Sequence, residues 1–258
     1  PVGAEDIGVH LDGAGRASRV DLDKSRAMLD RSAFHGVPVV TGWFGEGTDG
    51  DIALLGRGGS DHTATALAAL LQARRVTLWK DVSGIYPVNP RWGVQSTPIP
   101  YLGYGEAIAF SNADATILHP ATVEPVYEMG IPIEIRHLAH HKNGAMKTII
   151  GPDIEATPNI KGIACTPRVA YVNAEVRYSQ DAARALSDLL QQLDEEGIRI
   201  CSFETTNTQW RFVFLQHELN RGVQIINQHC SSVKYDYYAA MLSFIGCCDI
   251  EYLREQLG

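Results

Sequence analysis

A glycine-rich run at residues 55–61, LGRGGSD, restricts the fold of this chain more than any other stretch of its sequence. Before it, residues 52–55 have the aliphatic content of a buried strand. After it, residues 60–72 place apolar side chains at helical spacing. Because glycine lets the backbone turn sharply and lets a ligand approach it closely, the run predicts a tight connection from strand to helix.

The same run also predicts a site for an anion. Ser60 and Asp61 are suited to cap and charge the first helical turn. A helix N-terminus carries unpaired N–H groups and a partial positive charge, and Arg57 lies beside it, so a carboxylate or phosphate can bind there. The alternative is a turn between strand and helix that binds nothing, because glycine-rich turns are common in α/β proteins.

Strand-like and helix-like stretches alternate as far as about residue 150, which predicts an α/β fold with a mostly parallel, helix-covered sheet. We expect strands at residues 38–41, 53–55, 76–79 and 132–136. We expect helices at residues 22–34, 60–72, 104–110 and 120–129. The glycine-rich run then connects the second strand to the second helix.

The pattern changes after the turn-rich segment at residues 151–159, which predicts a domain boundary near residue 155. A strand, a helix and two further strands are expected at residues 170–177, 181–196, 198–205 and 210–216. This order fits a small antiparallel α+β sandwich. Beyond residue 216 we expect one more strand, at 237–245, and a short helix at 250–257.

Composition excludes several classes of function. With 258 residues, of which 45% are hydrophobic, the chain can bury a proper core, and its net charge of −8 argues against a general nucleic-acid binder. We expect no membrane span and a cytoplasmic location, because no apolar run approaches the required length. The five cysteines lack a recurring C-x-x-C spacing, and the pair His140-His141 has no evident third ligand, so no metal site is predicted.

A second motif, WKDVSGIYPVNPR at residues 79–91, begins where the expected strand 76–79 ends. Ligands of open α/β sheets bind at the carboxyl ends of strands. Asp81, Tyr86 and Arg91 could therefore hold the ribose, base and phosphates of a nucleotide. The alternative is a surface loop rich in turn-forming Gly, Pro and Asn.

Six stretches follow one another in an order and spacing typical of one family: VVTGWFG at 39–45, LGRGGSD at 55–61, LWKDVSGIY at 78–86 with NPR at 89–91, YGEA at 104–107, LHP at 118–120 and GIPI at 130–133. Over most of its length the chain therefore resembles the aspartate kinase family of the amino-acid kinase fold. From Ile160 onward it looks like the ACT regulatory modules that follow the kinase domain in that family.

The resemblance implies roles for individual residues. Arg57 would pair with a carboxylate of the amino-acid substrate, while Ser60 and Asp61 contact its polar groups. ATP binding would fall to Lys80, Asp81, Tyr86 and Arg91.

The reaction implied is transfer of the γ-phosphoryl group of ATP, with Mg²⁺, to the β-carboxylate of L-aspartate. Its product is 4-phospho-L-aspartate, which begins the biosynthesis of lysine, threonine and methionine. Phosphoryl transfer needs mainly alignment and charge stabilisation, so no nucleophilic side chain is required.

The resemblance also implies a domain plan. Residues 1–155 would form the amino-acid kinase domain, residues 160–217 one ACT-like module, and residues 218–258 part of a second. Amino-acid effectors of the family bind at ACT interfaces between subunits. We therefore expect a homodimer formed through these modules, with effector contacts at Tyr178, Ser179, Gln180 and Asp181. A simple helix cap at Ser179 is the alternative.

The sequence departs from the family pattern at several positions. The family's opening strand and loop, of a Lys-Phe-Gly-Gly type, has no counterpart in residues 1–34. Thr116 stands where the family has an ATP-binding lysine, and Asp114 adds a negative charge nearby, which would weaken nucleotide binding. Lys80 replaces the usual threonine of a Thr-Asp pair, and Asn89 the usual aspartate of Asp-Pro-Arg.

These departures keep two alternatives to an aspartate kinase open. One is a non-catalytic regulatory paralogue or subunit that binds an amino acid without the phosphate machinery. The other is a kinase for another amino acid.

Overall fold

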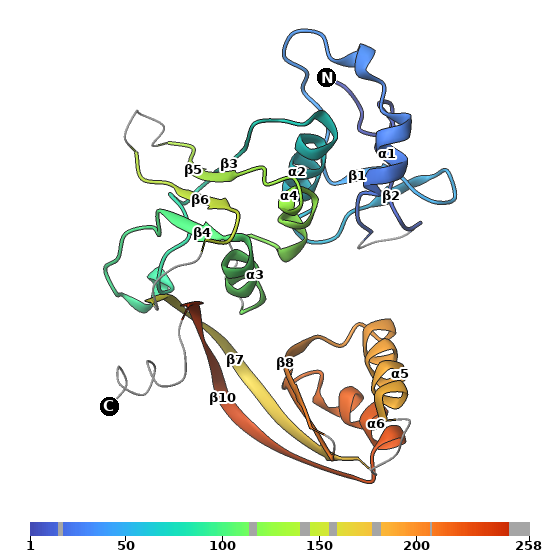
Figure 1. Ribbon diagram of the computed structural model, residues 1–258, viewed down its shortest axis with the longest axis vertical. Helices are drawn as coiled ribbons and strands as arrows, with labels where there is room; N and C mark the ends of the chain where they lie inside the picture. Colours follow the sequence, from blue (N-terminus) through green and yellow to red (C-terminus); the bar gives the residue numbers. More distant parts are fainter. Residues whose placement is uncertain are drawn as a thin grey trace. The chain divides into compact units, whose positions relative to one another are not determined.

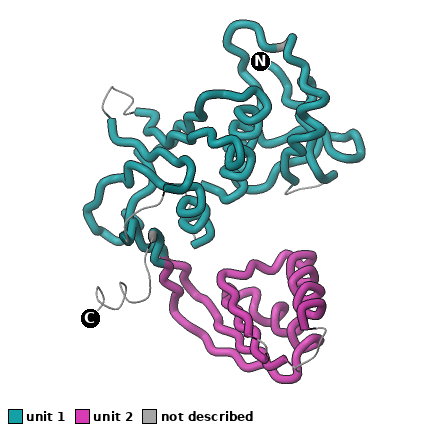
Figure 2. Tube along the Cα trace, in the orientation of Figure 1, with its two compact units in different colours: residues 1–164, 244–258 teal, residues 165–243 magenta. Residues whose placement is uncertain are grey.

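The computed structural model describes residues 1–14, 18–113, 118–139, 145–154, 159–176, 182–206 and 208–247. The chain forms two compact units (Figures 1 and 2). Unit 1 contains residues 1–164 and 244–258, and unit 2 contains residues 165–243. The sequence predicts a boundary near residue 155, whereas the two units divide at residues 164–165 and 243–244, and strand β7 (Asn159–Glu175) runs without a break from one unit into the other. Within these described residues, none of the helices has the length and apolar character needed to cross a bilayer.

Unit 1 contains a four-stranded sheet, a two-stranded sheet and four α-helices among the described residues (Figure 1). Its strands are β1 (Phe44–Glu46), β2 (Ile52–Leu54), β3 (Val76–Lys80), β4 (Tyr101–Gly103), β5 (Ile133–His137) and β6 (Thr148–Gly151). Its α-helices are α1 (Leu22–Met28), α2 (Gly59–Leu71), α3 (Tyr104–Asn112) and α4 (Glu124–Tyr127). Short 3₁₀ turns are η1 (Arg31–Ala33), η2 (Pro90–Trp92) and η3 (Pro120–Thr122).

The four-stranded sheet of unit 1 has the order β3-β5-β6-β4 and is mixed rather than mostly parallel. β3 pairs with β5, and β4 with β6, in parallel, but β5 and β6 are antiparallel. The physical reason is that β6 follows β5 with no described helix between them. Antiparallel strands need no such crossover.

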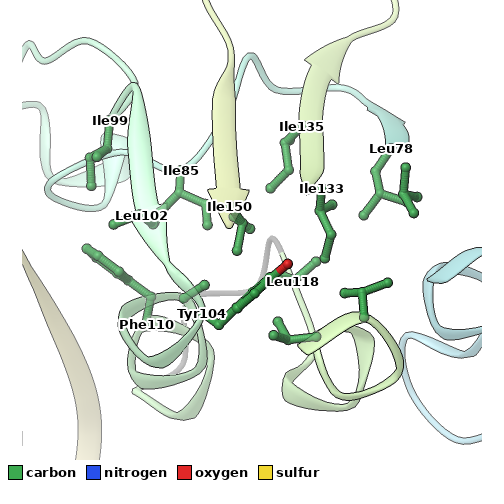
Figure 3. Close-up of a cluster of buried hydrophobic side chains, with 14 of the residues drawn as sticks. Leu78, Ile85, Ile99, Leu102, Tyr104, Phe110, Leu118, Ile133, Ile135 and Ile150 are labelled. Carbon is green, nitrogen blue, oxygen red and sulfur yellow. The ribbon is translucent and has the colours of Figure 1, made fainter. Parts of the chain in front are cut away.

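One face of this sheet packs on helices α3 and α4 (Figure 3). Leu78, Ile133 and Ile135 alternate with outward-facing residues along β3 and β5 and point into this core. Tyr104, at the start of α3, is 2% exposed, and its hydroxyl donates to the backbone carbonyl of Ile131 at 2.8 Å. Burial raises the pKa of Tyr104 to about 12. The core thus fixes the ends of β3 and β5 at one edge of the sheet.

The first 58 residues differ from the expected elements in three places, and one of them is strand β1, which was not expected. The predicted strand at residues 38–41 is reduced to one parallel bridge between Val2 and Val40. The predicted helix at 22–34 ends at Met28, and the side chain of Asp30 accepts from the Ser32 N–H to begin η1. An apolar cluster that includes Ile7, Val9 and Leu11 holds this part together.

Unit 2 folds around one antiparallel sheet and two helices. Its elements are β7, α5 (Ala182–Glu195), β8 (Ile200–Thr205), β9 (Gln209–Leu215), α6 (Leu219–His229) and β10 (Ser232–Cys247). The strand order is β10-β7-β9-β8. The expected division into one module at 160–217 and part of another at 218–258 is therefore wrong, because α6 and β10 complete a single β-α-β-β-α-β unit.

Helix α6 is the element that the sequence interpretation missed in unit 2. Its buried residues Leu219 and Ile226 face the same core as Phe212 and Phe214 of β9. The apolar spacing Leu219, Val223, Ile226 indicates this helix, but Gly222 and several polar residues weaken the pattern.

Candidate functional site

The glycine-rich run forms the predicted connection from β2 to α2. Gly58 precedes the helix with φ = +76°, a conformation that glycine adopts without strain. A Cβ on Gly58 would lie 2.5 Å from Cβ of His119, and one on Gly59 would lie 2.6 Å from both Cβ of Leu55 and Cδ1 of Trp43. Because the neighbouring atoms pack so closely, both positions of the turn have room for glycine but not for a residue with a side chain.

The cap of helix α2 differs from the prediction. The N-cap residue is Gly58, which has no side chain to cap the helix. Ser60 and Asp61 lie inside the first turn, where Asp61 supplies the negative charge that the helix dipole favours. Because the cap is a glycine, no side chain caps the N–H groups at the start of α2. The N–H of Gly59 donates to the carbonyl of Gly56 at 3.1 Å, so the N–H groups of Ser60 and Asp61 are the ones that can bind an anion.

A cavity of about 470 Å³ opens at this helix start. It is lined by Trp43, Gly56, Arg57, Gly58, Gly59, Ser60, Asp61 and Lys80. The structure thus brings together Arg57, Ser60 and Asp61, which the sequence assigns to the amino acid, with Lys80, which it assigns to the nucleotide. Lys80 lies at the last position of β3, and its Nζ is 2.6 Å from Oδ2 of Asp61.

Arg57 carries the exposed positive charge of this cavity. Within the part of the chain that the structure describes, no carboxylate forms an ion pair with its guanidinium. A guanidinium can bind a carboxylate through two parallel hydrogen bonds. Arg57 is therefore positioned to bind an incoming carboxylate next to the start of α2.

Trp43 is a cavity residue that sequence reasoning did not single out. It has φ = +81°, which is uncommon for a residue with a side chain. Its backbone N–H donates to Oγ1 of Thr63 at 3.1 Å, and its backbone carbonyl accepts from the backbone N–H of Leu55 at 2.8 Å. The motif VVTGWFG contains Trp43, but a sequence pattern does not reveal a positive φ at that position.

The other residues predicted to bind the nucleotide lie in the segment after β3 and are not part of the cavity lining. Asp81 and Arg91 are exposed and Tyr86 is half-buried. Asn89 begins η2, and its side-chain oxygen accepts from the backbone N–H of Arg91 at 3.0 Å. Of the four residues predicted to bind ATP, Lys80 lines the cavity, and the roles of all four stay predictions.

Several predicted positions lie outside the described residues. These are the effector contacts Tyr178, Ser179, Gln180 and Asp181, the departures Asp114 and Thr116, and the pair His140-His141. In the residues that the structure does describe, no group of three or more His, Cys, Asp or Glu side chains is arranged to hold a metal ion.

Two histidines lie near the start of α2 or within it. His119 is the N-cap residue of η3, and its Cβ lies close against Gly58. His62, in the first half of α2, is buried. Its Nε2 accepts from the N–H of Val20 at 3.0 Å, so the proton is on Nδ1, which donates to the carbonyl of Ala121 at 2.7 Å. Burial lowers the pKa of His62.

Comparison with known proteins agrees with the resemblance seen in the motifs. The model of the amino acid kinase family matches residues 2–137. Similar curated proteins include an aspartokinase of Geobacillus stearothermophilus, 28% identical over 92% of this chain and 58% of its own length. Another is an aspartokinase of Bacillus sp. (strain MGA3), 32% identical over 86% of this chain and 54% of its own length.

Solved structures show the same fold. E. coli aspartokinase III, in complex with aspartate and ADP, is 20% identical with a TM-score of 0.75, over 96% of this chain and 59% of the other. Clostridium acetobutylicum aspartate kinase gives 22% identity and a TM-score of 0.69, over 93% of this chain and 56% of the other. The chain spans little more than half the length of these relatives. It belongs to the amino acid kinase family, and the aspartokinases are among its relatives.

Proposed function

We propose that this protein is an aspartate kinase, which transfers the γ-phosphoryl group of ATP to the β-carboxylate of L-aspartate. The observation that carries the proposal is the cavity at the start of α2, where Arg57, Ser60, Asp61 and Lys80 meet. It offers cations and helix N–H groups for carboxylates, and the carboxylate of Asp61 for an ammonium group. An acidic amino acid carries both kinds of charge.

Each residue has a proposed role in this cavity. The guanidinium of Arg57 binds a substrate carboxylate through two hydrogen bonds. Asp61 accepts from the substrate ammonium group, and the hydroxyl of Ser60 contacts a second polar group. Together these contacts orient the β-carboxylate for attack on the γ-phosphorus, and orientation supplies much of the rate of such a reaction.

Phosphoryl transfer fits a site without a nucleophilic side chain, because the substrate carboxylate is itself the nucleophile. The protein then contributes alignment and positive charge near the transferring group. Lys80, Asp81, Tyr86 and Arg91 are proposed to bind the nucleotide. Mg²⁺ is proposed to enter with ATP, since it is commonly held by substrate phosphates and water together with one or two carboxylates.

Unit 2 is proposed to be an ACT-like regulatory module. The support is its β-α-β-β-α-β order and the strand order β10-β7-β9-β8. E. coli aspartokinase III has also been solved with lysine and aspartate. We propose that this protein likewise binds an amino-acid effector, through residues 178–181, and forms a homodimer through this module.

Trapping of the product tests the activity. Hydroxylamine converts an acyl phosphate into a hydroxamate, so the full chain incubated with MgATP, aspartate and hydroxylamine is expected to give aspartyl hydroxamate. Calorimetric titration with aspartate and with ATP accompanies the assay. Binding of an amino acid without hydroxamate would instead support the regulatory paralogue, and hydroxamate formed from a different amino acid would change the substrate.

Arg57→Ala is expected to abolish measurable aspartate binding. Truncating one partner of a charged, hydrogen-bonded pair costs about 2–5 kcal/mol, or roughly 30- to 5,000-fold in Kd. Titration calorimetry of both proteins measures the change. Arg74→Ala is the matched control, because Arg74 is an exposed arginine outside the cavity. Unchanged aspartate affinity in Arg57→Ala would overturn the substrate site.

A further inference from the structure

Lys80 forms an ion pair with Asp61, and the carboxylate of Asp61 is the group that is proposed to bind the substrate ammonium. The Nζ–Oδ2 distance is 2.6 Å, and the two side chains are 24% and 19% exposed. Among the eight described residues that line the cavity, Asp61 carries the single carboxylate, while Arg57 and Lys80 carry the positive charges. An arriving ammonium group must therefore share or replace Lys80 at Asp61.

We propose that Lys80 and Asp61 exchange their charged partners when the substrates bind, and that this exchange couples binding of the amino acid to binding of the nucleotide. The inference rests on the proposed function and adds a mechanism to it. When the amino acid binds, its ammonium group takes the place of Lys80 on Asp61. The Lys80 side chain then turns from Asp61 to an anionic phosphate oxygen of the nucleotide. No covalent bond changes in this exchange.

The placement of the two residues makes the exchange feasible. Asp61 is held in the first turn of α2, and Lys80 is held at the end of β3, so their backbones belong to different rigid elements. Lysine has a flexible four-carbon stem and a compact charge, whereas the aspartate side chain is short. The lysine is thus the partner that can move while the carboxylate stays in place.

Counting charge pairs shows why the two ligands should help each other. Without ligands there is one pair, Lys80 with Asp61. Aspartate alone competes with Lys80 for the carboxylate, and the nucleotide alone draws Lys80 away and leaves Asp61 near a triphosphate. With both ligands bound there are two pairs, ammonium with Asp61 and Lys80 with phosphate. Each ligand therefore raises the affinity for the other, by the same factor.

The experiment measures this factor by calorimetry on the full chain. Aspartate and the non-hydrolysable analogue adenylyl imidodiphosphate with Mg²⁺ are titrated singly and then each in the presence of the other. Coupling between sites typically amounts to about 5- to 150-fold. We expect at least about 5-fold tightening of each ligand by the other, the lower end of that range.

Variants of the pair give changes that a merely structural role would not produce. Lys80→Met removes the charge and is expected to reduce the coupling to about 1-fold, while aspartate alone binds as tightly as before or more tightly, because Asp61 is no longer paired. Lys80→Arg keeps the charge and should keep the coupling. Asp61→Asn should weaken aspartate and strengthen the analogue, since Lys80 is freed. Lys24→Met removes an exposed lysine in α1 and is the matched control.

The outcomes separate this inference from the proposed function. Absence of aspartate binding by the unaltered chain would overturn the proposed function itself. Aspartate and analogue binding without coupling would overturn only the exchange. So would coupling that survives in Lys80→Met, or aspartate affinity in that variant reduced as far as in Arg57→Ala. Thermal melting of every variant confirms that it is folded.

Discussion

At the scale of single residues, His62 connects two parts of unit 1 that are distant in sequence. Its two ring nitrogens bond to the backbone of Val20 and of Ala121. Desolvation is the largest influence on its pKa and lowers it, while the Ala121 carbonyl and the carboxylate of Glu124 act in the opposite direction but are outweighed. The imidazole is thus kept neutral, with both nitrogens used.

This arrangement predicts a stability that depends on pH. The pKa of His62 is lower in the folded state than the ordinary value of about 6.5, so below that pH the unfolded chain binds more protons. The contribution of His62 is therefore present above about pH 6.5 and is lost as the pH falls below it. Urea denaturation should show a lower midpoint at about pH 5.5 than at about pH 7.5.

Two variants identify the source of that pH dependence. His62→Gln can keep similar hydrogen bonds without a titrating ring, so its change in midpoint between the two pH values should be smaller. His35→Gln removes an exposed imidazole and should leave the change as it is in the unaltered chain. An identical change in all three proteins would exclude His62 as the cause.

Single residues also show how far sequence reasoning reaches. Arg57, Ser60 and Asp61 are brought into one cavity because they are consecutive with a glycine turn, which the sequence displays directly. The contact of Lys80 with Asp61 was not foreseen, because it depends on how β3 lies beside α2. Trp43 joins the cavity through a positive φ that only the surrounding packing enforces.

At the scale of elements, the start of helix α2 depends on a glycine that satisfies two requirements at once. Gly58 has φ = +76° and lies directly against His119. Gly50 has a similar φ of +84°, but nothing lies within 4 Å of its added Cβ. A substitution at Gly50 therefore introduces backbone strain alone, whereas a substitution at Gly58 introduces backbone strain together with a steric clash.

Substitution by alanine should expose this difference. Gly50→Ala is expected to cost about 1 kcal/mol, the lower end of the strain for a side chain at positive φ. Gly58→Ala adds overpacking of about 1–3 kcal/mol, so we expect a total near 2–4 kcal/mol. Urea denaturation of both variants measures the free energy of unfolding. Equal costs would show that His119 moves away freely.

The elements that the sequence predicted well are those whose own pattern is strong. Helices α2 and α5 and strands β3, β5 and β9 occur close to their expected bounds. The expected strand at 38–41 has the right composition but lacks a partner beyond one bridge, and pairing is a tertiary property. Strands β4 and β6 are short, so they carry too few residues for a periodic signal.

At the scale of the whole molecule, the buried apolar residues fall into three separate clusters. The first is formed by the mixed sheet and the helices that pack on it, the second by the first 58 residues together with α2, and the third by unit 2. The change of pattern after residues 151–159 predicted a second domain, but the path of the chain through the two units was not predictable. Strands β7 and β10 each place one residue, Ala164 and Ile245, in the core of unit 1, although most of both strands belongs to unit 2.

Separate cores predict that damage to one unit stays local. Leu189 of α5 is 0% exposed in the unit 2 core, so Leu189→Ala should cost that unit about 2–5 kcal/mol. Hydrogen exchange followed by mass spectrometry should then speed up in α5 and β9, while the cavity segments 55–61 and 76–80 keep their rates. Leu78→Ala, in the core of unit 1, should give the opposite pattern. Faster exchange in both units from either change would mean that the chain unfolds as one cooperative body, and an effector bound to unit 2 could then reach the cavity through global stability alone.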